Sequence, residues 1–129
     1  MLLEDVLRKP EGEAARVVLI HGGFPWHEQV AYLAAVGLGV WVEFSLSNLV
    51  SPASTADRLL RLLNLAPTGR LLVGGDGHGV PETHWFALGV VRDGWSVMRD
   101  RLGAASRAGW IDDVERNVFA DDARRLCRL

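Results

Sequence analysis

Short apolar runs alternate with longer amphipathic stretches along this chain. The apolar runs, each rich in valine or leucine, cover residues 16–20, 40–44 and 70–73. The stretches with helical spacing are a first one around Leu3, Val6 and Leu7, then 26–36, 55–65, 81–102 and 111–126. Strands that alternate with helices in this way predict a parallel sheet with right-handed crossovers. We therefore expect an α/β fold made of one helix, three β/α units and a final helix.

Local signals refine several of these predicted elements. Ser54 and Asp57 resemble a capping box, which predicts that a helix begins directly after Ser54. The stretch 45–52, between the second strand and that helix, is expected to be a loop. Gly89 and Gly94 weaken the long helix that contains them, on propensity alone.

A parallel sheet of three strands, with helices on one side, leaves its second face uncovered. In a closed (β/α) barrel the remaining strands cover that face. The pattern therefore predicts that residues 1–129 form one incomplete unit of a larger sheet. We expect a complementary half-barrel, or a second copy of the chain, to bind through the exposed sheet face.

Composition narrows the function classes. The chain has 129 residues, of which 49% are hydrophobic, and a net charge of −2. The near-neutral charge gives no reason to expect nucleic acid or an anionic membrane as a partner. The longest uncharged run, 30–42, is too short to span a bilayer. A single cysteine, Cys127, and an acidic start without an export signal lead us to expect a cytoplasmic protein.

Residues that can carry chemistry follow the predicted strands, at the edge where parallel folds place their sites. They are His21 after the first strand, Ser45 and Asn48 after the second, and Asp76 and His78 after the third. An imidazole and a carboxylate, here His21 and Asp76, are common ligands of hydrolytic Zn²⁺. The alternative is that His21 bonds to backbone at a strand end and Asp76 bonds to amides of its own turn. His27 and His84 lie in predicted helices and are expected to be structural.

Two other interpretations of the segment "GGDGHG", residues 74–79, remain open. A phosphate-binding loop would need a Lys-Ser/Thr pair or G-x-G-x-x-G spacing, and the segment has neither. In an α/β-hydrolase, "LIHGGFPW" would end the oxyanion-hole strand and Asp76 would be a nucleophile. Against this, His78 stands where a small residue is wanted, and no histidine follows late in the chain to act as base.

Three segments together resemble one known family. They are "VVLIHGGFPWHEQVAYLAAVGLGVWVEFSLSNLVSP", "LLNLAPTGRLLVGGDGHGVPE" and "DDARRLCRL", in this order and spacing. They resemble the C-terminal part of the amidohydrolase-related family, and most closely the amidohydrolase-like modules related to, or fused with, glutamine-synthetase-like domains. The resemblance implies a partial (β/α)8 TIM-type barrel, made of the last three parallel β/α units plus C-terminal helices.

The resemblance also implies roles for particular residues. His21 matches the metal-binding histidine that ends the sixth barrel strand. Asp76 matches the aspartate that ends the eighth, which binds the metal and accepts a proton from the attacking water. His78 and Glu82 match the "h-x-x-p-e" part of the branch motif and are expected to contact substrate, or in the case of His78 to order the Asp76 loop. The implied activity is metal-dependent hydrolysis of C–N bonds in a small molecule, with a divalent metal, zinc, at the completed site.

This sequence departs from the family pattern at several positions. Glu43 and Asp122 stand where the branch has aspartate and asparagine, and Gly75 and Gly77 replace a hydroxyl residue and an alanine beside Asp76. The H-x-H pair of the family's first strand is not among these residues, nor are the ligands of its fourth and fifth strands. We therefore expect this chain alone to have no more than weak metal affinity and little hydrolase activity, and the alternative is a catalytically inactive fragment or partner module.

Overall fold

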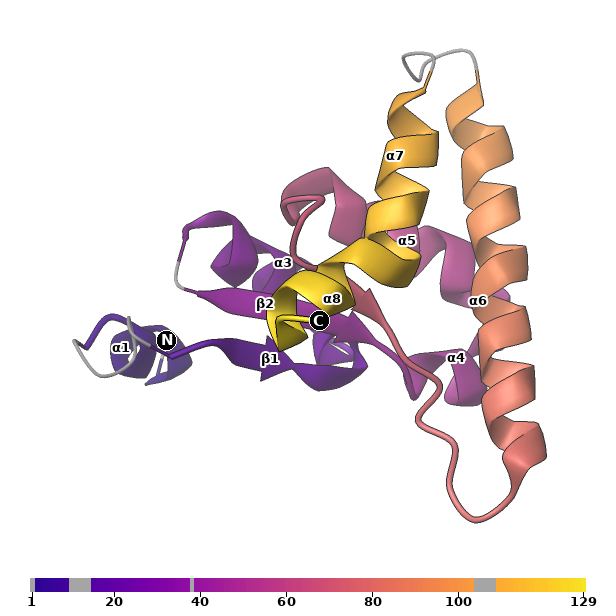
Figure 1. Cartoon of the computed structure of the whole chain (residues 1–129), viewed down its shortest axis with the longest axis horizontal. Helices are drawn as coiled ribbons and strands as arrows, with labels where there is room; N and C mark the ends of the chain where they lie inside the picture. Colours follow the sequence, from indigo (N-terminus) through magenta and orange to yellow (C-terminus); the bar gives the residue numbers. More distant parts are fainter. Residues whose placement is uncertain (1, 10–14, 38, 104–108) are drawn as a thin grey trace.

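A sheet of three parallel strands is the centre of the computed structural model, which describes residues 2–9, 15–37, 39–103 and 109–129. The strands β1 (Val17–Leu19), β2 (Val40–Phe44) and β3 (Leu71–Val73) lie side by side in chain order (Figure 1). Both pairs are parallel, so the three strands end at the same edge of the sheet. The predicted parallel α/β arrangement is confirmed.

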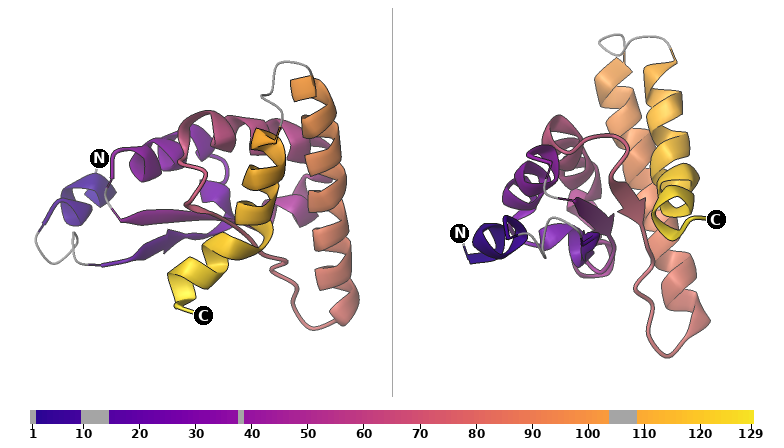
Figure 2. Two further views of the ribbon diagram at one scale, coloured as in Figure 1. Left: turned by 45° about the horizontal axis from the view of Figure 1, so that its top comes forward. Right: turned by 60° about the vertical axis from the view of Figure 1, so that its left-hand side comes forward.

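Helical segments precede, connect and follow the strands. In chain order they are α1 (Leu2–Leu7), η1 (Ile20–Gly23), α3 (His27–Ala35), α4 (Ser47–Val50), η2 (Pro52–Ser54), α5 (Thr55–Leu65), α6 (Pro81–Leu102), α7 (Trp110–Arg116), η4 (Asn117–Asp121) and α8 (Asp122–Cys127). Helices α6 and α7 stand beside each other as a pair that extends beyond the sheet (Figure 2). Trp95 and Phe119 meet edge to face between α6 and η4, with ring centroids 5.5 Å apart.

Most predicted boundaries are confirmed. Strand β2 and helices α5 and α6 have the predicted ranges, and β1 and β3 are slightly shorter than predicted. The single helix predicted over 111–126 is instead three consecutive segments, because η4 between α7 and α8 has π-type hydrogen bonding. No helix in the described ranges is long and apolar enough to cross a membrane.

Two local predictions around residues 45–54 are wrong, and Arg58 is the physical reason. Its guanidinium is buried and donates hydrogen bonds of 2.8 Å to the carbonyl oxygens of both Ser47 and Ser51. These bonds satisfy carbonyls of a short helix, α4, where the sequence predicted a loop. Arg58 also donates to the Ser54 hydroxyl, which therefore caps no backbone amide of α5, and the predicted capping box is absent.

The first face of the sheet carries the hydrophobic core. Alternation along β2 buries Val40, Val42 and Phe44 on this face. They form one cluster with residues of several helices, including Leu33 of α3, Leu59 and Leu62 of α5, Val91, Trp95 and Met98 of α6, and Val114 of α7. Each such side chain contributes about 1.5–3 kcal/mol when fully buried. The core therefore fixes the orientation of β2, and with it the residues that point to the opposite face.

The second face of the sheet is formed by the alternate residues of the strands. The register places Val18 beside Trp41 and Glu43 beside Leu72. Leu72 is buried, while Val18, Trp41 and Glu43 are half-buried. This face is therefore less exposed than the sequence predicted.

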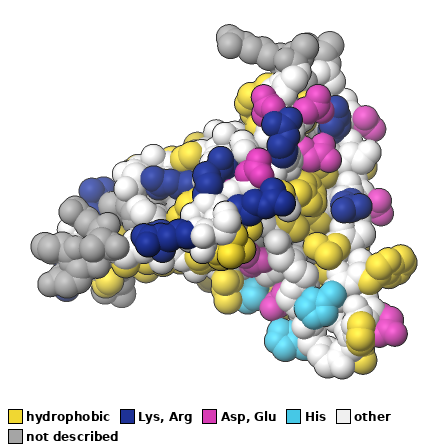
Figure 3. Space-filling model, in the orientation of Figure 1, with side chains coloured by type: hydrophobic (Ala, Val, Ile, Leu, Met, Phe, Trp, Pro, Cys, Tyr) yellow, Lys and Arg dark blue, Asp and Glu magenta, His cyan; other side chains and the backbone are white. Residues whose placement is uncertain are grey.

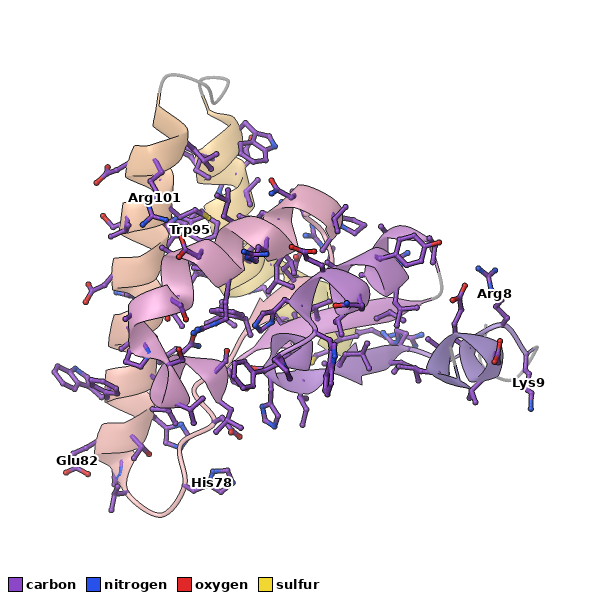
Figure 4. All side chains as sticks on the ribbon, turned by 180° about the vertical axis from the view of Figure 1, so that it is seen from behind. Arg8, Lys9, His78, Glu82, Trp95 and Arg101 are labelled. Carbon is purple, nitrogen blue, oxygen red and sulfur yellow. The ribbon has the colours of Figure 1, made fainter. Side chains whose placement is uncertain are left out.

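Helix α8 accounts for part of this coverage. It crosses from β3 toward the start of β1, on the side of the sheet away from α3 and α5 (Figures 1 and 4). The buried Asp122 carboxylate accepts a hydrogen bond of 3.2 Å from the Leu71 amide, and Arg16 donates one of 2.6 Å to the Leu126 carbonyl. The prediction of a wholly bare second face is wrong, because α8 is held across it at both edges.

Candidate active site

The structure brings His21 and Asp76 together at the carboxyl edge of the sheet. His21 lies in η1 directly after β1, and Asp76 lies in the loop after β3. The Nδ1 atom of His21 is 3.8 Å from the Oδ2 atom of Asp76, and their side chains are 30% and 21% exposed. The distance is too long for a hydrogen bond, and both groups remain accessible from solvent. The sequence predicted this proximity from the strand ends; the role of both residues as metal ligands stays a prediction.

Both residues have left-handed backbone conformations. The φ angle is 64° at His21 and 47° at Asp76, in a region that residues other than glycine adopt at a cost of about 1–3 kcal/mol. Such backbone conformations cluster at sites where side-chain direction matters more than local stability. Here they turn the two side chains toward each other immediately after their strands end.

Glu43 of the central strand and Ser45, which directly follows that strand, complete the cluster. The Ser45 hydroxyl donates a 2.6 Å hydrogen bond to Oε2 of Glu43, and it lies 3.1 Å from Nδ1 of His21. The same Glu43 oxygen accepts a 3.3 Å hydrogen bond from the His21 backbone amide. His21 is therefore held both by its backbone and by its ring.

The importance of Glu43 was not predicted from the sequence, where it counted only as a departure from the family pattern. The period of two along β2 was the available signal, because continued by one residue past the strand end it places Ser45 on the same side as Glu43. Gly74 at the end of β3 is a second condition. A Cβ atom at this position would overlap the Glu43 carboxylate, so the glycine leaves the space that this side chain occupies.

His78 and Glu82 lie further out, in the loop after β3 and the first turn of α6. Both are exposed, and they point away from each other on the two sides of that loop (Figure 4). Nδ1 of His78 lies 3.1 Å from the carbonyl oxygen of Asp76. This contact favours the interpretation that His78 orders the Asp76 loop. Their predicted contact with substrate stays a prediction.

The two remaining histidines have different surroundings. His27 is buried, and its Nδ1 lies 2.7 Å from the Gly22 carbonyl oxygen. Burial lowers the pKa of His27 and so favours its neutral form, and the buried ring agrees with the structural role expected from the sequence. His84 is exposed, and its ring borders Gly75 and Gly77, where a Cβ atom would come within 3.0 Å and 2.5 Å of ring atoms, so a side chain at either position would require the ring to shift. Histidine side chains gather at this end of the molecule, beside exposed hydrophobic residues (Figure 3).

The donor set of the site fits a divalent metal but is incomplete. A neutral imidazole and a carboxylate suit zinc, which takes three or four protein ligands. Within the part of the chain that the structure describes, no group of three or more His, Cys, Asp or Glu residues is arranged to hold a metal ion. His21 and Asp76 are thus a pair of ligand candidates that needs further donors.

Comparisons with known proteins identify the same family as the sequence motifs. A family model described as Amidohydrolase matches residues 1–127. The chain is 35% identical over 77 residues to the protein fluG of Emericella nidulans, a match that covers 59% of this chain and 9% of that protein. A solved structure described as a "putative metal-dependent hydrolase" from Lactobacillus casei ATCC 334 has a TM-score of 0.87 at 21% identity. It matches 98% of this chain and 33% of its own, so this chain spans about a third of that protein's length.

Proposed function

The chain belongs to the amidohydrolase family, and we propose that it supplies part of the active site of a metal-dependent hydrolase that cleaves C–N bonds in a small molecule. His21 and Asp76 are two ligands of a divalent metal, zinc, and Asp76 is also the general base. The observation that carries this proposal is the convergence of the two side chains at the carboxyl edge of a parallel sheet, 3.8 Å apart.

The chemistry follows from the two side chains. A divalent cation held by such a pair supplies positive charge that acidifies water and polarises a carbonyl group. The Asp76 carboxylate, with one oxygen turned toward His21, accepts the proton that an attacking water loses. The neutral His21 ring donates a lone pair and is kept in place by Ser45 and Glu43. His78, close to the Asp76 carbonyl, holds the loop that carries the base.

The proposed zinc site needs further protein ligands from outside the described residues. A hydrolytic zinc site needs at least one more protein ligand than this pair, plus an open position. The chain corresponds to about a third of the solved protein that it resembles. We infer that a complementary part of the (β/α)8 barrel brings the other ligands to the same edge. Exposed apolar residues near the two strand ends, Ile20, Trp26 and Trp85, are suited to contact it.

Zinc titration by calorimetry tests the ligand assignment. We expect weak binding by the chain alone, which His21→Ala or Asp76→Asn abolishes. Asp93→Asn, on the exposed side of α6, removes an equivalent charge away from the site and should leave binding unchanged. Zinc binding that persists in both site variants would refute the assignment.

A second copy of this chain is the other possible source of ligands. Two copies would offer two imidazoles and two carboxylates, which is enough for one tetrahedral zinc. Light scattering with and without zinc distinguishes the sources. A zinc-dependent dimer with one zinc per two chains indicates self-association, whereas a monomer under both conditions points to a separate complementary segment.

The alternative of an inactive partner module rests on the incomplete donor set in the described residues. It predicts no specific zinc binding and no effect of His21→Ala. Calorimetry of the wild type therefore also decides between the two proposals.

A further inference from the structure

Three groups at the site form a continuous hydrogen-bonded chain that ends on the His21 ring. The Ser45 Oγ atom is the middle member, at 2.6 Å from Glu43 Oε2 and 3.1 Å from His21 Nδ1. Ser45 is buried, with 3% of its surface exposed, so water does not readily replace either partner. The direction of each hydrogen bond in this chain therefore determines where the imidazole proton lies.

The direction follows from counting donors. An ionised carboxylate accepts hydrogen bonds and donates none, so the single hydroxyl proton of Ser45 is committed to Glu43. The Ser45 oxygen can then only accept from the ring. A hydrogen bond between His21 and Ser45 therefore requires a proton on Nδ1, which leaves Nε2 unprotonated in the neutral ring.

We infer that Ser45 and Glu43 are positioning residues that hold neutral His21 in the Nδ1–H tautomer, so that Nε2 is the atom offered to a metal ion. The inference rests on the proposed function for the identity of the ligand, but not for the tautomer itself. Metal-binding histidines are commonly oriented by a hydrogen bond from their second ring nitrogen, and that bond raises the basicity of the ligating one.

The local structure supports this assignment beyond the ring contact. Glu43 also accepts a hydrogen bond from the His21 amide, at a residue with left-handed backbone. The same carboxylate thus fixes the backbone and, through Ser45, the ring. The absent side chain of Gly74 leaves room for that carboxylate.

The competing arrangement uses Nδ1 as the ligand, because Nδ1 is also the ring atom that lies 3.8 Å from Asp76. A metal bound between these atoms would require the proton to move to Nε2. The Ser45 oxygen would then lose its donor from the ring. The two arrangements predict opposite tautomers and are directly separable.

The experiment is a long-range ¹H–¹⁵N correlation spectrum of the full chain without metal, under mildly alkaline conditions where imidazoles are neutral. We expect the wild-type His21 signals to show the Nδ1–H tautomer. Ser45→Ala removes the acceptor and should shift the population toward Nε2–H, which a solvated imidazole prefers. The control, Ser96→Ala, removes an exposed hydroxyl on α6 and should change nothing. A predominant Nε2–H tautomer in the wild type would overturn the inference.

A second variant keeps the test decisive if Ser45→Ala does not fold. Glu43→Gln retains the shape of the side chain, but its amide can donate to Ser45 and so reverse the hydrogen-bonded chain. We expect a mixture of tautomers in this variant. An unchanged pure Nδ1–H form in Glu43→Gln would show that the carboxylate does not set the tautomer.

Zinc affinity, measured in parallel, separates this inference from the proposed function. Loss of a residue that orients a metal ligand typically weakens metal binding by about 10- to 100-fold, and we expect that loss for Ser45→Ala. An Nδ1–H tautomer in a chain that binds no zinc would contradict the proposed function alone. Zinc binding by a chain with an Nε2–H His21 would contradict this inference alone.

Discussion

Gly94 and Gly89 offer a matched pair of substitutions within one helix. Both lie in α6 and both weaken it on propensity, so alanine at either position should add roughly 1 kcal/mol of helix stability. The structure predicts that only Gly89→Ala realises this gain. Apart from the adjacent residues and the nearby backbone of α6 itself, no atom of the described residues lies within 4 Å of the position that a Cβ would take at Gly89.

Gly94 lies where α6 packs most closely against α5. A Cβ at this position would be 2.5 Å from Cγ2 and 3.0 Å from Cβ of Thr55, and 3.3 Å from the Ala56 amide nitrogen. Thr55 is buried and the amide belongs to the backbone, so neither group can move away easily. Overpacking of this kind costs about 1–3 kcal/mol. Because the gain of roughly 1 kcal/mol in helix propensity offsets part of this cost, we expect Gly94→Ala to give no gain in stability and to destabilise the chain by up to about 2 kcal/mol.

Urea denaturation followed by circular dichroism measures both variants against the wild type. Thr55→Ser provides the rescue, because it removes the Cγ2 methyl group and keeps the hydroxyl that faces Arg58. In a double-mutant cycle we expect a favourable coupling of about 0.5 kcal/mol or more between Gly94→Ala and Thr55→Ser. If Gly94→Ala is as stabilising as Gly89→Ala, the close approach of α5 and α6 described here is incorrect.

The remaining predictions concern two buried ionisable groups, Asp122 and His27. Asp122→Ala should destabilise the chain by about 1–3 kcal/mol, because the Leu71 amide loses its hydrogen-bond acceptor, the buried Asp122 carboxylate. Asp122→Asn keeps an acceptor oxygen and should stay within about 1 kcal/mol of the wild-type stability. Burial raises the pKa of Asp122 in the fold, so the wild type should lose stability as pH increases through that raised pKa. Asp122→Asn cannot ionise at this position, so its stability relative to wild type should rise over the same range. Urea titrations that show a constant difference between the two proteins would contradict this. Burial lowers the pKa of His27, so the wild type should lose stability as pH falls below about 6.5. His27→Gln should lose less stability over the same pH range. An equal loss in both proteins would refute the lowered pKa of His27.

The fold was largely predictable because the signals that start and end its helices and strands are local in the sequence. The bounds of β2, α5 and α6 follow from apolar runs and from nearby glycines and prolines, which act within a few residues. Helix α4 was not predictable in this way. It depends on the buried guanidinium of Arg58, which bonds to the carbonyls of Ser47 and Ser51 from a different helix. Contacts of this kind become visible only when the chain is folded.

The sequence predicted which strand ends form the candidate site, but not how its side chains are linked. That parallel strands end at one edge was enough to bring His21 and Asp76 together. The link through Ser45 and Glu43 was not predicted, because Glu43 was considered only as a departure from an aspartate. The physical difference is reach: one more methylene group lets the carboxylate extend over Gly74 to the His21 amide.

Because of the position of α8, the chain can be stable on its own even if its candidate site lacks metal ligands. The sequence-based case for a partner assumed a bare second face, whose exposure would cost the chain much of its stability. The structure instead holds α8 across that face, from Asp122 beside β3 to Leu126 beside the start of β1. Arg16 and Leu71, which make these contacts, lie at the beginnings of their strands, whereas His21 and Asp76 follow the ends. One end of the face is thus closed by the chain itself, and the additional donors of the proposed site would have to reach the other end, which holds His21 and Asp76. The partner proposed above is therefore argued from the number of metal ligands that the proposed site needs and not from a bare sheet face, and a stably folded monomer is compatible with that proposal.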